Sequence, residues 1–252
     1  HENQDDFRLN TLLSKLTQHK IEVYPLTSDF EFKDRKYAKG NSYYVPLAQP
    51  QFRLIQALFT QETNFKDNTF YDVSGWTMPL AMNIESIQID RTRGLKLAKQ
   101  TWSMASTSVE NNKNNSAYGY IFEWHHFLAP KLLNKLLASN IKARVATKSF
   151  TSVINGTKKH FEPGSIVIPA GIQSDEKWQE KLISASNIIG IKLNPISTGL
   201  TMKGIDIGSS SLKPINRAKT LLLGGDGISQ YEAGEVRFYL DDTLGIPLSI
   251  ID

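Results

Sequence analysis

The feature that most constrains the fold is a repeat with a spacing of 120 residues. Of the 24 residues at positions 7–30, eight recur unchanged at positions 127–150. After a three-residue insertion, the block at 42–46 aligns with the block at 165–169, and both run from serine to proline. Any two helix–strand segments look somewhat alike, but the shared order of blocks favours an internal duplication.

Each copy has the pattern of a helix, a strand, a hairpin and a second helix. In the first copy, apolar residues line one face over residues 5–18 and again over 51–60, which predicts two amphipathic helices. Between them, residues 21–24 alternate like a strand, and residues 30–45 have the pattern of a hairpin. The second copy is preceded by a further predicted strand, residues 118–124. The counterpart of that strand would precede His1, so we expect the chain to be a fragment.

A strand–helix–strand unit closes the sequence. Residues 218–223 predict a strand, 231–242 a helix with Val236 and Leu240 facing inward, and 247–251 a second strand. Because a helix of about a dozen residues joins the two strands, we expect them to be parallel. Parallel strands are normally buried on both faces. This unit is therefore expected either to join the preceding sheet or to be completed by strands outside the sequence.

The predicted fold class is α/β: internally duplicated α-β-hairpin-α units with mixed sheets, followed by a βαβ unit of flavodoxin-like type. We expect three parts, at residues 1–110, 117–212 and 217–252. The polar run from Glu110 to Ser116 is predicted to be a mobile loop between the copies.

Composition narrows the possible functions. The chain has no cysteine, which excludes disulfides, thiolate chemistry and cysteine-ligated zinc. Its net charge of +4 comes from scattered basic residues, without a basic stripe or interleaved aromatic residues, so nucleic-acid binding is not expected. No apolar run approaches the ~20 residues of a membrane span.

Three blocks carry a resemblance to a known family: residues 70–80 (Phe-Tyr-Asp-Val-Ser-Gly-Trp-Thr-Met-Pro-Leu), 40–50 and 224–240. In this order they resemble the region downstream of the catalytic domain in large bacterial zinc carboxypeptidases. In that family, a stretch like Ser-Gln-Tyr-Glu-Ala-Gly-Glu at 229–235 opens a domain similar to a class I glutamine amidotransferase.

The resemblance implies an exported protein, periplasmic or secreted, whose zinc belongs to a catalytic domain outside this sequence. It also implies two partners, the catalytic domain of the parent protein and a peptide or cell-wall-like substrate. No catalytic residue of the family falls within the chain. Neither a metal site nor a cofactor is therefore expected here.

One pattern imitates a zinc site. His19 and Glu22 form a His-x-x-Glu pair, with His160 and Glu235 further along the chain. Two histidines and a carboxylate would suit hydrolytic zinc. The helix is predicted to end at His19, however, and the second copy has serine and lysine at the corresponding positions. We interpret the match as chance.

Glu123, His125 and His126 form the most promising polar cluster. They follow a predicted strand and precede a predicted helix, and ligands often bind beyond the carboxyl ends of parallel strands. Neighbouring histidines could act as acid–base groups or ligands. The alternative is that one histidine caps the helix and the other packs at an interface.

Gly225, Asp226 and Gly227 form a second candidate, because a glycine-rich loop between strand and helix can present N–H groups to an anion. The alternative is a tight turn that requires positive φ. Tyr71, Asp72 and Trp76 could line a sugar- or peptide-binding groove, or pack one domain against another.

The leading hypothesis is a non-catalytic accessory or scaffolding region of an exported zinc carboxypeptidase-like protein, which aids substrate binding or domain docking. The alternative is a small-molecule-binding α/β module that resembles an inactive glutamine amidotransferase-like domain. An autonomous hydrolase is disfavoured, because no nucleophile, base and orienting group come together in the sequence. A broad apolar face would favour the scaffold, and a deep polar pocket would favour the binding module.

Overall fold

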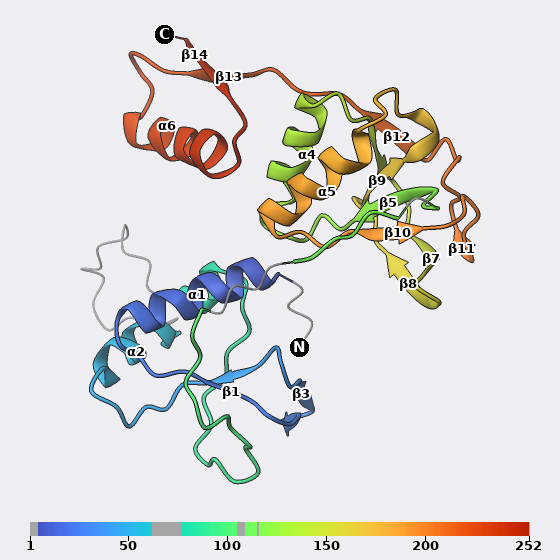
Figure 1. The fold of residues 1–252 in the computed structure, drawn as a ribbon. Helices are drawn as coiled ribbons and strands as arrows, with labels where there is room; N and C mark the ends of the chain where they lie inside the picture. The colour runs from blue at the N-terminus through green and yellow to red at the C-terminus, as the bar shows by residue number, and fades with distance from the viewer. Residues whose placement is uncertain (1–4, 62–76, 105–108, 115, 252) are drawn as a thin grey trace. The chain divides into compact units, whose positions relative to one another are not determined.

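The computed structural model describes residues 5–61, 77–104, 109–114 and 116–251. The chain divides into two compact units, residues 1–106 and residues 107–252. Each unit contains helices and sheets, so the α/β class predicted from the sequence is correct at this level (Figure 1).

The first unit is built around a long amphipathic helix, α1. Its elements are α1 (Asp6–Gln18), β1 (Tyr24–Pro25), β2 (Phe30–Phe32), β3 (Arg35–Tyr37), β4 (Tyr43–Tyr44), α2 (Phe52–Phe59) and α3 (Met78–Ala81). The side chain of Asp5 accepts a hydrogen bond from the backbone N–H of Arg8 and so caps α1. Four leucines of α1 are buried against Ile21, Val23 and Ile55 and form the core of this unit: Leu9, Leu12, Leu13 and Leu16.

The second unit contains a five-stranded sheet in the order β10-β5-β9-β6-β12. Its elements are β5 (Gly119–Phe122), α4 (Ala129–Ala138), β6 (Ala143–Ala146), β7 (Phe150–Ile154), β8 (Thr157–Phe161), β9 (Ile166–Pro169), a 3₁₀ turn (Ala170–Ile172), α5 (Trp178–Ile189), β10 (Asn194–Ile196), β11 (Lys203–Gly204) and β12 (Leu212–Ile215). Every neighbouring pair in this sheet is antiparallel.

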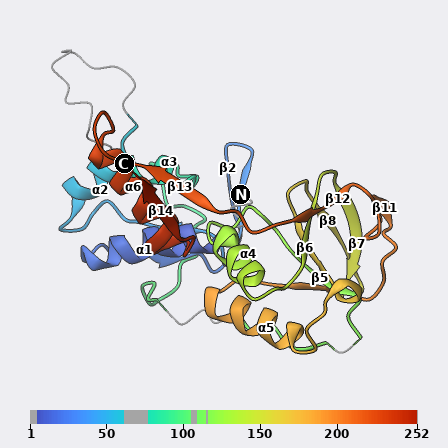
Figure 2. The ribbon, with the colours of Figure 1, turned by 90° about the horizontal axis from the view of Figure 1, so that it is seen from above.

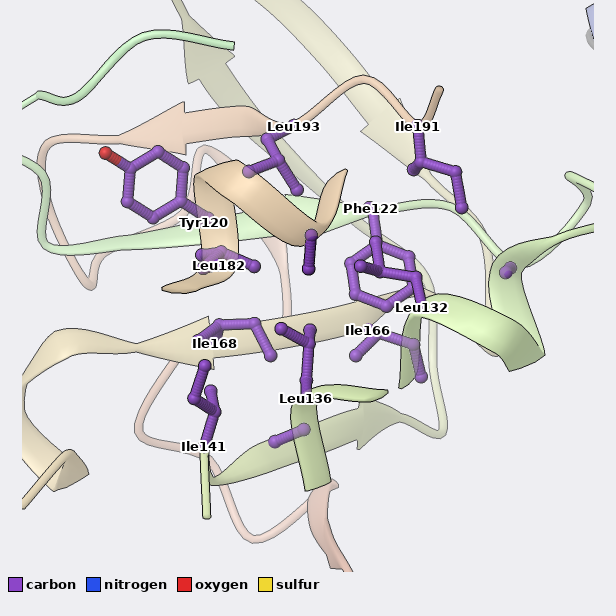
Figure 3. Packing of buried hydrophobic residues seen from close by; sticks show 13 residues of the cluster. Tyr120, Phe122, Leu132, Leu136, Ile141, Ile166, Ile168, Leu182, Ile191 and Leu193 are labelled. Carbon is purple, nitrogen blue, oxygen red and sulfur yellow. The ribbon is translucent and has the colours of Figure 1, made fainter. Parts of the chain in front are cut away.

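The sheet separates two cores because successive side chains of a strand point to opposite faces. Tyr120 and Phe122 pack with the helices α4 and α5 on one face, where Leu132, Leu136 and Leu182 join them (Figure 3). On the other face, Ile121 and other alternate residues pack against the three-stranded sheet β11-β7-β8. Residues 119–215 of the second unit therefore form three layers, with the helices α4 and α5 on one face of the five-stranded sheet and the sheet β11-β7-β8 on the other (Figures 1 and 2).

Both edge strands of the five-stranded sheet contain a proline, Pro195 in β10 and Pro214 in β12. Proline has no backbone N–H to offer to an added strand, and it is a common feature of exposed sheet edges. At each edge of the sheet, one residue therefore has no N–H with which to hydrogen-bond an additional strand.

The two units share details of strand register and helix termination at positions about 120 residues apart. Tyr24 pairs with Tyr44 in the first unit, as Arg144 pairs with Val167 in the second. Gln49 and Gln173 each accept a backbone N–H with the side-chain oxygen, from Glu22 at 2.8 Å and from Lys142 at 3.0 Å. Both first helices are followed by a residue with φ 59°, Lys20 and Asn140. Burial differs at several equivalent positions: Leu13 is buried and Leu133 only partly so, whereas Phe30 is half-buried and Phe150 is buried.

Two hairpins occupy equivalent places but have different turn residues. The two-residue loop between β2 and β3 is Lys33-Asp34, with φ of 48° and 62°. The loop between β7 and β8 is Asn155-Gly156, with φ of 49° and 81°. Turns with two positive φ values favour Asn-Gly, because a side chain other than that of asparagine or aspartate is strained there.

We expect the double substitution Lys33→Asn/Asp34→Gly to raise the free energy of unfolding of the first unit by about 1 kcal/mol, because it relieves the strain at Lys33. Urea unfolding followed by circular dichroism would measure the change. The reverse exchange, Asn155→Lys/Gly156→Asp, should destabilise the second unit by a similar amount. A first unit that is weakened by Asn-Gly would show that the turn is not under strain.

The closing part of the chain forms its own two-stranded sheet. Its elements are β13 (Thr220–Leu223), α6 (Gln230–Arg237), a π-helical segment (Phe238–Thr243) and β14 (Leu248–Ile251). β13 and β14 are parallel, with Thr220 opposite Leu248, which confirms the strand directions predicted from the sequence. Among the described residues, neither strand joins the five-stranded sheet.

The prediction that Val236 faces this sheet is wrong, because its side chain is 42% exposed. Leu240, by contrast, is half-buried. The predicted helix is interrupted at Phe238, where the chain continues as a π-helical segment, and this change shifts the face that it presents. A sheet of only two strands is also too narrow to cover one whole side of the helix.

The polar run before β5 is anchored, although the sequence predicts a mobile loop. Asn111 is 8% exposed. Its side-chain NH₂ donates to Ser186 Oγ at 3.0 Å and to the Ile191 carbonyl at 2.8 Å, and its side-chain oxygen accepts the Leu193 N–H at 2.8 Å. A polar side chain is stable in a core when its hydrogen bonds are satisfied there. Composition alone therefore misjudged this run.

Candidate functional site

Glu123 directly follows β5, but it lies at the end of an antiparallel strand. From the sequence, Glu123 was expected at the carboxyl ends of parallel strands, where ligands often bind. β5 is flanked by β9 and β10, and both run antiparallel to it. The sheet therefore has no parallel strand ends at Glu123, and this part of the ligand-binding argument is lost.

The Glu123 carboxylate is paired with Lys159 across the two sheets. The Lys159 Nζ lies 2.5 Å from Glu123 Oε2 and 3.2 Å from the side-chain oxygen of Asn194. The same Nζ lies 5.4 Å from the centre of the Phe161 ring. The side chains of Glu123 and Lys159 are 21% and 36% exposed. These contacts join β8 to the ends of β5 and β10, and they give Glu123 a structural partner.

Lys159 and Asn194 were not predicted as site residues from the sequence. Lys158 and Lys159 look like a basic pair in a turn, yet they lie in β8 and point to opposite faces. The signal that could have separated them is the alternation that leads to buried Phe161. Asn194 is 71 residues from Glu123, so no local pattern connects the two.

His126 forms hydrogen bonds within the turn that leads into α4. Its Nδ1 accepts the backbone N–H of Leu128 at 3.1 Å, and its carbonyl accepts the N–H of Ala129 at 2.9 Å. His125 is exposed to solvent. Leu128 occupies the N-cap position of α4, so these His126 bonds stabilise the turn before the helix, and they do not confirm the capping alternative considered from the sequence.

The glycine-rich loop has the geometry of a turn. Gly225 and Gly227 have φ of 76° and 84°, and the Ile228 N–H bonds to the Gly225 carbonyl at 3.3 Å. Asp226 is exposed, and Glu232 lies in the first turn of α6. Two carboxylates near a helix N-terminus oppose anion binding there, so these features favour the tight turn.

Tyr71, Asp72 and Trp76 lie outside the described residues. Within the second unit, contacts between the closing part and α4 come from other side chains. Lys131 Nζ donates to the Thr243 carbonyl at 3.0 Å, and Asn134 Nδ2 donates to the Gly245 carbonyl at 2.6 Å. The rings of Phe127 and Tyr239 meet edge to face, with centroids 5.9 Å apart.

These α4 contacts satisfy carbonyls at the end of the π-helical segment. A helix ends with unpaired carbonyls, and cationic or amide donors stabilise them. These contacts could not be predicted from the sequence, because Lys131 and Asn134 look like ordinary solvent-facing positions of an amphipathic helix.

His160 lies in a row of groups that superficially resembles a hydrolytic triad. Its Nδ1 is 3.2 Å from Thr151 Oγ1, and its Nε2 is 3.4 Å from a Glu162 oxygen. The side chains of His160 and Glu162 are 54% and 77% exposed, so water screens the pair. A triad also needs a positioned oxyanion site, and the order of the two ring nitrogens is the reverse of the serine protease arrangement.

No group of three or more metal-ligating side chains that could hold an ion occurs among the described residues. Glu22 of the His-x-x-Glu pattern lies in the first unit, where its carboxylate accepts a hydrogen bond from the Tyr24 hydroxyl at 2.8 Å. No helix in the described ranges is long and apolar enough to cross a bilayer.

No protein-family model, curated protein or solved structure matches the chain.

Proposed function

We propose that the chain is a non-catalytic accessory module that docks onto another domain of an exported zinc carboxypeptidase-like protein. The observation that carries the proposal is the uncovered apolar face of the parallel pair β13–β14. The family assignment itself comes from the three sequence blocks described above.

The exposed face is made of alternate residues of the two strands. Leu221 and Leu223 are 63% and 62% exposed, and Ile251, which pairs with Leu223, is 44% exposed. On the opposite face, Leu222 and Leu248 are half-buried, and Ile250, which pairs with Leu222, is 49% exposed. Parallel strands are normally covered on both faces, because their connections place helices there. An exposed apolar face of this kind is typical of a surface that contacts another protein domain.

The first two parts of the chain are proposed to be copies of one ancestral unit. The 120-residue repeat supports this, as do the equivalent strand register, the paired glutamines and the left-handed residues after the first helix of each unit. The closing part is proposed to open a flavodoxin-like, glutamine amidotransferase-like domain. Its parallel strands and crossover helix support that proposal.

Hydrogen exchange would test the docking function. The backbone amides of residues 220–223 and 248–251 would be followed in the chain alone and with a zinc carboxypeptidase-like catalytic domain added as a separate protein. We expect exchange in both segments to slow at least about tenfold on docking. The double substitution Leu221→Lys/Leu223→Lys should abolish the slowing, whereas Ile188→Lys, at an equally exposed apolar position on α5, should preserve it.

The same experiment distinguishes docking from the alternative function, that of a small-molecule-binding module. Unchanged exchange with the added domain would contradict docking. Slower exchange at residues 224–227 on addition of glutamine, without any effect of the domain, would support the binding module instead.

A further inference from the structure

The loop that precedes β11 has a shape fixed by hydrogen bonds. Asp206 Oδ1 accepts the Thr201 N–H at 2.7 Å and the Thr201 hydroxyl at 3.2 Å. The Leu200 N–H bonds to Thr198 Oγ1 at 3.2 Å, and the Ile207 N–H bonds to the Gly199 carbonyl at 2.9 Å. These bonds tie the tip of the loop to its own base.

This constrained loop displays two large apolar side chains. Leu200 is 72% exposed and Met202 is 52% exposed. Single exposed apolar residues are common on protein surfaces. Here two of them lie within three residues, on a backbone that its own hydrogen bonds hold in place. Two exposed apolar side chains on a constrained loop are more typical of a binding loop than of isolated exposed residues.

Exposed lysines lie next to the loop in the chain and on or beside the strands that follow it in the sheet. Lys203 pairs with Thr151 on β7, and Lys158 of β8 pairs with Val153 of β7 on the same outward face. Lys148 lies two residues before the start of β7, and its side chain is exposed. Among the described residues, no ion pair involves Lys148, Lys158 or Lys203.

Two carboxylates also lie in this part of the unit. Asp206 accepts the hydrogen bonds of Thr201, and Glu162 lies beside His160. Both carboxylates keep their negative charge, so the three lysines leave an excess of one positive charge around the loop.

We propose that this loop binds the surface of an anionic lipid bilayer, with Leu200 and Met202 entering the boundary between headgroups and acyl chains. The lysines lie beside the headgroups, where anionic lipids attract them. A protein partner fits less well, because a stable protein interface needs about 800 Å² from each side, and a two-residue tip supplies much less. The proposal is independent of the docking face on β13–β14.

Vesicle co-sedimentation of the whole chain tests the proposal. We expect binding to phosphatidylcholine vesicles that contain about a third phosphatidylglycerol, and much weaker binding to phosphatidylcholine alone. Leu200→Ser/Met202→Ser should weaken binding at least about tenfold. Lys158→Glu/Lys203→Glu should weaken it by a similar factor.

Two control variants lie in the helix layer, on the other side of the five-stranded sheet. Ile188→Ser removes an apolar side chain on α5 that is 73% exposed, and Lys177→Glu makes the same type of charge change as each lysine substitution. Both should bind within about twofold of the unchanged chain, and circular dichroism confirms that each variant is folded. The Leu221→Lys/Leu223→Lys variant should also bind normally, which separates this proposal from the docking proposal.

Three results would overturn the proposal. The first is no binding to the anionic vesicles. The second is equal loss of binding in the loop and α5 variants. The third is binding that persists in Leu200→Ser/Met202→Ser and is matched by binding to polyglutamate, which would reduce the interaction to charge alone.

Discussion

Replacing Asn111 with alanine is expected to lower the free energy of unfolding of the second unit by about 3–5 kcal/mol. The substitution leaves the buried Leu193 N–H and Ile191 carbonyl without this partner, and the Ser186 hydroxyl keeps only its bond to the Ile183 carbonyl. Each buried group that loses its hydrogen bond costs about 1–3 kcal/mol. The small cavity left by the removed carboxamide adds to the loss. Urea unfolding, followed through the four tryptophans of the chain, measures the change.

Asn112 provides the matched control because it is the next residue and is exposed. Asn112→Ala should change stability by less than about 0.5 kcal/mol. Asn111→Asp, which keeps the shape of the side chain, should still destabilise the unit, since a carboxylate cannot donate to the Ile191 carbonyl. Equal stability of the Asn111→Ala and Asn112→Ala variants would mean that the polar run does not hold β10 to α5.

Gly204→Ala is expected to destabilise the second unit by about 3 kcal/mol or more, because the added methyl group has no room. A Cβ at this position would lie 2.4 Å from the Ser149 carbonyl oxygen and 2.8 Å from Phe150 Cα. Both are backbone atoms, which move only if β7 and β11 separate. The φ of 91° adds strain for any residue other than glycine. Thermal unfolding by calorimetry would measure the loss.

Gly156→Ala is the comparison that isolates the clash. Gly156 also has positive φ, 81°, but a Cβ there meets nothing within 4 Å. We expect it to cost about 1 kcal/mol, the strain of the backbone alone. If the two alanine variants are equally stable, the close approach of β11 to β7 is not a real constraint.

The first helix of this fold could be predicted because its signal is local: the leucines of α1 share one face within four turns. The hairpin predicted over residues 30–45 was wrong in its pairing. β2 pairs with β3 across Lys33-Asp34, and β4 pairs with β1 instead, a longer-range choice that the local pattern does not show. The parallel pair β13–β14 was also predictable, because the length of the connecting helix decides the direction of the second strand.

The direction of β5 was not predictable in the same way. Its neighbours β9 and β10 lie more than 40 residues further along the chain, and nothing in residues 118–124 states which way they run. The candidate site depended on that direction, so the argument for Glu123 as a ligand-binding residue failed with it. The pairing of Glu123 with Lys159 is likewise a long-range choice, made by the packing of one sheet on another.

The prolines at the edges of the five-stranded sheet have a consequence for how this protein would fail under stress. Runaway aggregation commonly spreads when one chain adds a strand to an open edge of another. Pro195 and Pro214 block that route at both ends of the large sheet. The pair β13–β14 has no proline and carries leucine and isoleucine at most positions. Fibril growth, if it starts at all from the folded second unit, should therefore start at residues 220–223 or 248–251.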